Sequence, residues 1–345
     1  MSSHFVRSTL KVTFLFAVSA VGCLAQKVVA RIPTEGTVAS FAVNPLSDRI
    51  YASVFILNTG PFPNQLLIID GKTQKLVNTV LIGFQNPTNI AVNPVTGRIY
   101  ATQCFNNLPM CNVQVFDSEG NSVTTISVFT GSGGDMYLTN IVVNPFTNRI
   151  YVGGQPQNGS EVVVIDGNTN VVTDQIEFGD NFPQALAIDS IRDRLFVLNG
   201  HGALNVIDCR TNKVIASSGS GKFGGVLDID PLSSTLYVGA IANSGNAIDF
   251  VNENNLSILK SFDLPFSPVA IAPDIFSDQL FVAFFNGEYI VFDGDKKHSE
   301  SGVANGPLAV NPLTKLLYAV GPVPQTGPPE TIEVVSGVVT AEAAH

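Results

Sequence analysis

The stretch Asn44-Pro-Leu-Ser-Asp-Arg-Ile-Tyr51 returns in seven related forms along this chain of 345 residues. Each copy follows an apolar run and consists of Asn or Asp, a polar turn that usually contains Pro, an aliphatic residue and an aromatic residue. Successive copies begin 49, 51, 45, 41, 44 and 37 residues apart, which is the spacing of propeller blades. The repeat predicts one closed array rather than two domains. The Asn or Asp that begins each copy, here called the anchor, is Asn44, Asn93, Asn144, Asp189, Asp230, Asp274 or Asn311.

Each repeat is predicted to form a blade of four strands. The apolar run before the anchor, such as 89–92, suits an innermost strand that is buried on both faces. The anchor side chain then accepts backbone N–H groups in a tight turn. Arg49-Ile-Tyr51 begins the second strand and places an aromatic ring between neighbouring blades. The third strand ends in a second repeated signal, Ile69-Asp70-Gly71 in the first copy, and a more polar outer strand follows.

The segment 27–32 resembles an outer strand that lacks its three inner partners. We expect it to pair beside 331–335, because closing the ring removes exposed sheet edges. The stretch 338–342 is a rival for the same place, and either segment closes seven blades. The predicted fold is therefore an all-β, seven-bladed β-propeller of four-stranded blades over residues 26–345, closed by the N-terminal strand.

The combined pattern of apolar-Asn-Pro-x-Thr-x-Arg-Ile-Tyr and Val-Ile-Asp-Gly-x-Thr-Asn-x-Val resembles the YVTN family of β-propeller repeats, the YncE-like exported proteins. The resemblance covers nearly all of the chain after the leader, although the literal string Tyr-Val-Thr-Asn is absent. Matching places read Tyr51-Ala-Ser-Val54 and Phe196-Val-Leu-Asn199. The resemblance implies an exported propeller, with nucleic-acid binding in some members. It transfers no catalytic residue, because the matched motifs build the blades.

The N-terminal residues 1–25 are predicted to be a signal peptide. Arg7 and Lys11 precede an apolar stretch, 12–21, which is followed by small residues and Ala25. Cleavage after Ala25 would release a periplasmic or extracellular protein without a transmembrane helix. The alternative is a bacterial lipobox at 20–23, which would leave a lipid on Cys23.

The charge of the chain argues against nucleic acid as a partner. The net charge is −10, and loss of Arg7 and Lys11 with the leader makes it −12. Phosphate binding depends on a concentration of Lys and Arg that is missing here. We expect a monomer whose partner is a protein or a small polar ligand.

Two cysteines are placed to form a disulfide. Cys104 and Cys111 flank the connection between two predicted strands, so a bond would staple the mouth of a hairpin. Cys209 is then unpaired and is predicted to be an inert, partly buried thiol.

No catalytic centre is expected from the remaining motifs. His201 and His298 are scattered, so they do not provide the clustered ligands of a transition-metal site. His201 lies in a predicted hairpin loop and is expected to be solvated. The segment 217–222 contains Ser and Gly but neither a base for serine chemistry nor the spacing of a phosphate-binding loop, so it is predicted to be a flexible loop.

The axial funnel is the best candidate site. Convergent amides and hydroxyls there could hold a polar ligand or Ca²⁺, whereas ordered water is the favoured occupant. The approach loops add Asp135, Asp180 and Asn181. The candidate ligand-binding residues are Ser40, Thr88, Asn89, Thr139, Asn140 and Gln184.

We therefore predict an exported, non-catalytic binding or protein-interaction scaffold without a cofactor, Ca²⁺ being the one candidate ion. Long connections at 55–65, 104–111, 153–160 and 321–329 offer recognition surfaces. A lactonase- or lyase-type enzyme with its site in the funnel is the alternative. Single-stranded nucleic-acid binding, by analogy with the family, is the second alternative.

Overall fold

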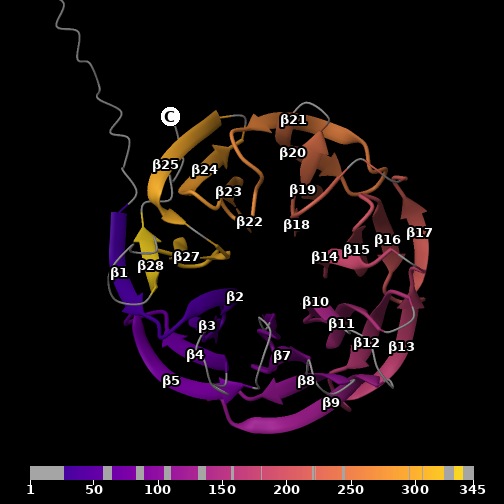
Figure 1. The fold of residues 1–345 in the computed structure, drawn as a ribbon, viewed down its shortest axis with the longest axis horizontal. Helices are drawn as coiled ribbons and strands as arrows, with labels where there is room; N and C mark the ends of the chain where they lie inside the picture. Colours follow the sequence, from indigo (N-terminus) through magenta and orange to yellow (C-terminus); the bar gives the residue numbers. More distant parts are fainter. Residues whose placement is uncertain are drawn as a thin grey trace, which may run out of the picture.

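The described part of the chain is entirely β-structure (Figure 1). The computed structural model describes residues 27–56, 64–82, 89–104, 110–130, 137–156, 159–179, 181–219, 221, 223–242, 245–294, 296–304, 306–321 and 330–336. These residues form seven four-stranded antiparallel sheets arranged around an axis, as predicted. None of them forms a helix of the length and apolarity needed to cross a bilayer.

Each blade runs outward from the axis in chain order. The first blade comprises β2 (Thr37–Asn44), β3 (Arg49–Phe55), β4 (Asn64–Asp70) and β5 (Lys75–Ile82), and the second comprises β6 (Ile90–Val92), β7 (Ile99–Cys104), β8 (Met110–Phe116) and β9 (Ser122–Thr130). The third comprises β10 (Tyr137–Asn144), β11 (Arg149–Gln155), β12 (Glu161–Asp166) and β13 (Val171–Glu177), and the fourth comprises β14 (Pro183–Asp189), β15 (Arg194–Asn199), β16 (Leu204–Asp208) and β17 (Lys213–Ser217). The fifth comprises β18 (Leu227–Asp230), β19 (Thr235–Ala242), β20 (Gly245–Asn252) and β21 (Ile258–Leu264), and the sixth comprises β22 (Ala270–Asp274), β23 (Gln279–Ala283), β24 (Gly287–Asp293) and β25 (Lys296–Ala304).

The seventh blade joins the two ends of the propeller. It contains β26 (Leu308–Asn311), β27 (Leu316–Val320), β28 (Thr331–Ser336) and, as its outer strand, β1 (Lys27–Pro33). Ile32 lies opposite Ile332 in this antiparallel pair, and the Arg31 Nε donates to Glu333 Oε1 at 2.8 Å. The N-terminal strand therefore closes the ring, as predicted (Figure 1). The rival segment 338–342 lies outside the described residues.

The anchors form the same turn in every blade. The Oδ1 atom of each anchor accepts the backbone N–H of the second residue after it, at 2.8–3.2 Å. The fourth residue after each anchor, such as Asp48 or Lys315, has a φ between 49° and 69°. This left-handed conformation turns the chain into the second strand. We call the five residues from the anchor to this position the anchor turn.

Four anchors also bind a side chain in the anchor turn of the following blade, a link that the sequence did not predict. The Asn93 amide donates to Asn148 Oδ1 at 2.7 Å, and the Asn144 amide donates to Asp193 Oδ1 at 2.7 Å. The third example is Asn311, which donates to Asp48 Oδ1 at 2.8 Å across the ring closure. The fourth example is Asp274, whose two carboxylate oxygens each accept from Lys315 Nζ at 2.9 Å.

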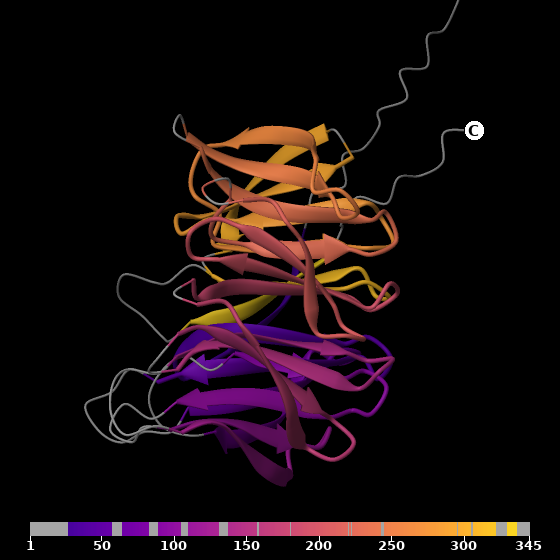
Figure 2. The same ribbon diagram turned by 90° about the vertical axis from the view of Figure 1, so that its right-hand side faces the viewer.

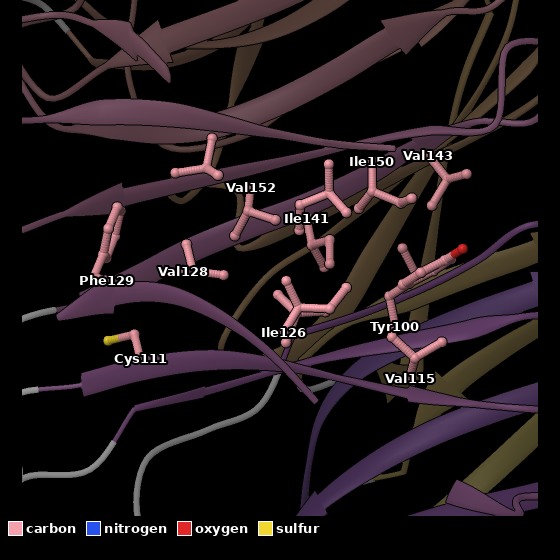
Figure 3. Packing of buried hydrophobic residues seen from close by; sticks show 14 of the residues in the cluster. Tyr100, Cys111, Val115, Ile126, Val128, Phe129, Ile141, Val143, Ile150 and Val152 are labelled. Carbon is pink, nitrogen blue, oxygen red and sulfur yellow. The ribbon is translucent and has the colours of Figure 1, made fainter. Parts of the chain in front are cut away.

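Large side chains fill the space between neighbouring blades. In Figure 3, Tyr100, Val115 and Ile126 of the second blade pack against Ile141 and Ile150 of the third. Burial of such apolar surface is the main favourable contribution to folding. The aromatic residue of the second strand is at most 4% exposed in every blade, at Tyr51, Tyr100, Tyr151, Phe196, Tyr237, Phe281 and Tyr318.

The cysteines lie where the sequence placed them. Cys104 and Cys111 face each other across β7 and β8 at disulfide-bonding distance, with Cα atoms 4.2 Å apart. Cys209 is completely rather than partly buried, and this burial raises the pKa of its thiol to about 12. A thiol that stays protonated is a poor nucleophile, which agrees with the predicted inert role.

Candidate functional site

The innermost strands surround an open hollow of roughly 360 Å³ at the axis. Its lining includes four of the six predicted funnel residues, Ser40, Asn89, Asn140 and Gln184. Thr139 is not part of the lining, and Thr88 lies outside the described residues. The walls between the polar groups are mainly aliphatic, with side chains such as Leu186 and Ile271. The sequence thus located the hollow but did not distinguish the roles of its residues.

Three of the predicted residues hold neighbouring blades together. Ser40 Oγ accepts the backbone N–H of Ile90 at 3.4 Å. The Asn89 amide donates to the backbone carbonyl of Thr139 at 3.0 Å, and the Thr139 hydroxyl donates to the backbone carbonyl of Pro183. These bonds connect the first four blades in order. Their first role is structural, because the bonds satisfy polar groups at the centre of the ring.

Polar groups on blades three, four and five remain available to a ligand. Asn140 Oδ1 accepts the N–H of Ile141 at 2.7 Å, and its amide nitrogen makes no hydrogen bond within the described part of the chain. The Gln184 side chain forms no hydrogen bond to any described residue, although it lines the hollow. Asp228 Oδ1 accepts only the N–H of Ile229, at 2.8 Å. Two amides and a carboxyl group therefore converge on one side of the channel.

Asp228 is the functional candidate that sequence reasoning missed. Burial raises the pKa of its carboxyl group to about 7, although the hydrogen bond from Ile229 N–H opposes the shift. It is the one carboxylate in the described lining of the hollow. A signal was present in the sequence. Asp228 lies two residues before its anchor, and in the other six repeats this position is Ala or Val, as at Ala42 and Val142.

The approach to the hollow contains a hydrogen-bonded pair. His201 is exposed, as expected, but its Nδ1 is bonded to Asn181 Oδ1 rather than only to solvent. These residues belong to the two connections that flank β14 and β15. Of the other residues predicted in the approach loops, Asp135 and Asp180 lie outside the described residues.

Exposed aromatic rings lie near the start of three innermost strands. Tyr137 begins β10 and is 47% exposed, and Phe182 directly precedes β14 and is 37% exposed. Phe266 lies in the connection before β22 and is 46% exposed. None of the three rings is part of the lining of the hollow, and the Phe266 ring lies 6.0 Å from that of Phe284.

The site offers little to a metal ion. Among the described residues, no group of three or more His, Cys, Asp and Glu side chains is placed to hold one. One carboxylate with two amides also provides less negative charge than most Ca²⁺ sites use.

This arrangement defines a seven-bladed β-propeller with a polar hollow at its axis. No family model and no curated protein matches the chain, so the resemblance to the YVTN family rests on the sequence motifs alone. Among solved structures, the chain is similar to hydrazine synthase of Kuenenia stuttgartiensis, with a TM-score of 0.67 and 14% identity over 84% of this chain and 93% of that chain. Similarity at this level shows the fold alone. Because 1495 chains of solved structures match, the architecture by itself assigns no function.

Proposed function

We propose that the protein is a non-catalytic binding scaffold that takes a small polar ligand into the axial hollow. The observation that supports this function is the convergence of Asn140, Gln184 and Asp228 from three successive blades. Within the described part of the chain their polar groups form no bond between blades, in contrast to those of Ser40, Asn89 and Thr139. A rigid ring holds the three groups in place, which lowers the entropy cost of binding.

The chemistry of the lining favours a ligand with several hydroxyl groups, such as a carbohydrate. Amides and a carboxyl group pair with hydroxyls, while the exposed faces of Tyr137, Phe182 and Phe266 can pack against C–H groups of a sugar ring. An anionic ligand is disfavoured, because the chain has a net charge of −10 and an acid lines the hollow.

The enzyme alternative receives less support from the same residues. A lactonase- or lyase-type centre would need two or more carboxylates meeting an amide, whereas the described lining provides Asp228 alone. A single carboxyl group can accept a proton, but it has no partner acid or nucleophile among the described lining residues. Nucleic-acid binding is opposed by the acidic net charge.

Export belongs to the same proposal. Cys104 and Cys111 lie at disulfide-bonding distance, and structural disulfides persist mainly in oxidising compartments. The proposed leader lies outside the described residues.

A calorimetric and thermal-shift titration of the purified protein with mono- and oligosaccharides tests the binding function. We expect a saturable rise in Tm with at least one sugar, since a ligand of the native state stabilises it by mass action. The variants Gln184→Ala and Asp228→Asn should each weaken binding by about tenfold, the effect of losing one hydrogen bond to the ligand.

Matched controls use the same changes on outer strands, Gln175→Ala and Asp263→Asn, both at exposed positions. These should bind like the unmodified protein. Absence of any sugar response, or equal losses in the funnel variants and the controls, would contradict a ligand site in the hollow.

A further inference from the structure

Every blade exposes one large apolar side chain at the same place in its anchor turn, the second residue after the anchor. Their exposed fractions range from 54% to 72%. We call this set the apolar ring, and it consists of Leu46, Val95, Phe146, Ile191, Leu232, Phe276 and Leu313.

The local structure makes these seven positions equivalent. The backbone N–H of each one donates to its anchor, at 2.8–3.2 Å, so the backbone is fixed in the same way in all blades. All anchor turns join the innermost strand to the second strand, so they lie on one face of the disc that Figure 2 shows from the side. The seven side chains therefore form a ring around the axis, on the face opposite the entrance to the innermost strands.

The positions that directly flank the ring residues carry little charge, although the fourth residue after the anchor is Asp48, Asp193, Asp278 or Lys315 in four blades. The three residues that follow each anchor give 21 positions, and Arg192 is the one charged residue among them. Arg192 is itself paired with Asp189 at 2.9 Å and with Glu253 at 3.0 Å. The other positions are Pro, Ser, Thr or aliphatic and aromatic residues. Depletion of charge at an apolar patch is a feature of protein interfaces.

The exposed apolar area of the ring is large enough for a specific interface with a second ring of the same kind. At roughly 150 Å² per large side chain, the exposed fractions leave about 80–110 Å² on each residue. Seven residues then contribute about 640 Å² per copy and about 1,300 Å² when two such rings meet, at the lower end of the 1,200–2,000 Å² of specific interfaces.

We propose that two copies of this protein associate face to face through their apolar rings. A second copy presents the same seven apolar side chains. A two-fold axis perpendicular to the propeller axis therefore brings the two rings into contact, with the same surface used on both copies. A lipid surface fits less well, because attachment to anionic membranes uses clusters of Lys and Arg. The anchor turns contain two basic residues, Arg192 and Lys315, and both are paired with carboxylates. The sequence predicted a monomer because each ring residue, considered singly, is an ordinary turn residue.

Sedimentation of the purified protein over a range of concentrations up to about 100 µM tests the association. We expect a monomer–dimer equilibrium that strengthens with added salt, because both copies are acidic and salt screens their repulsion. The triple variant Leu46→Ser, Phe146→Ser and Phe276→Ser should raise the dissociation constant at least tenfold. These side chains are exposed, so the variant should fold like the unmodified protein.

The control is a triple variant on the outer strands, Leu81→Ser, Val171→Ser and Leu259→Ser, at positions that are 63%, 54% and 52% exposed. It should dimerise normally. A monomer at every concentration, or a dimer that the control disrupts and the ring variant does not, would overturn the proposal. Binding of the monomer to lipid vesicles that the ring variant abolishes would overturn it in favour of a membrane surface.

Discussion

Two carboxyl groups with raised pKa values, half-buried Asp228 and buried Glu253, show how single residues adjust the stability of this propeller to pH. Asp228 is surrounded by the innermost strands, and burial raises its pKa to about 7. Glu253 is 1% exposed beside Asp189, and burial together with the neighbouring acid raises its pKa to about 7 as well. Arg192 and Arg194 oppose the shift at Glu253. Both groups are more easily protonated in the folded protein than in the unfolded chain.

This leads to a pH prediction with a definite sign. The ordinary pKa of Asp228 is 3.8, so between pH 4 and pH 7 the folded state binds more protons than the unfolded state. The contribution of Asp228 to the free energy of unfolding therefore falls as pH rises through this window. The measurement is urea unfolding of the unmodified protein and of Asp228→Asn at pH 5 and pH 8. We expect the loss of unfolding free energy between these two pH values to be smaller in the variant, by on the order of 2 kcal/mol.

Asp263→Asn, at an exposed position, serves as the control and should leave the pH dependence unchanged. If Asp228→Asn also leaves the pH dependence of the unmodified protein unchanged, the carboxyl group of Asp228 is ionised normally in the folded state.

At the level of the element, the anchor turn is the unit that the chain repeats and varies. Three Asn anchors donate to an Asp or Asn of the next turn, whereas Asp274 accepts from Lys315 at the corresponding place. Gly97 provides no side chain at this place, and the Asn44 amide donates instead to the backbone carbonyl of Pro94 at 3.4 Å. For these five anchors, the group that the anchor binds therefore changes with the residue at the fourth position after the next anchor.

The amide–carboxylate pair of Asn144 and Asp193 should be replaceable by a carboxylate–ammonium pair like that of Asp274 and Lys315. Asn144→Asp sets a carboxylate against Asp193 and should cost about 2–4 kcal/mol of stability, because the position is buried. Asp193→Lys alone should also destabilise, since the Asn144 amide then faces an ammonium group. The double variant copies the pair of Asp274 and Lys315, and we expect it to recover at least about 1 kcal/mol relative to the sum of the single changes.

Urea unfolding of the four proteins measures this coupling. Strictly additive single effects would show that the anchor amide makes no energetic link between blades.

Repetition explains how much of the fold could be predicted. Seven anchors with their aromatic partners fixed the strand order, the turns and the closure by 27–32, since each depends on local pattern. The links from Asn144 to Asp193 and from Asn89 to Thr139 depend on the twist between blades, which no local pattern contains. For the same reason the sequence could name the polar funnel residues but could not separate those that join blades from those that face the hollow.

For the whole molecule, closure by β1 sets a limit on processing of the chain. β1 begins at Lys27, so the mature protein must retain residues from that point to keep its seventh blade complete. Cleavage after Ala25 meets this condition. We expect exported protein to begin at Gln26, as determined by intact-mass spectrometry.

A mass that corresponds to a lipid on Cys23 would support the alternative anchor and would also leave β1 intact. A chain that retains its first 25 residues after purification from the cytoplasm would contradict export.

The pairing of β1 with β28 also determines when the molecule can become complete. Arg31 and Glu333 are separated by 302 residues, so the first strand to be synthesised waits for almost the last one. Forming such a distant contact is slow, because the entropy lost in closing a long loop precedes the gain from pairing. A nascent chain therefore remains an open, unfinished array until synthesis has nearly ended, and any prematurely terminated chain leaves β1 without its partner.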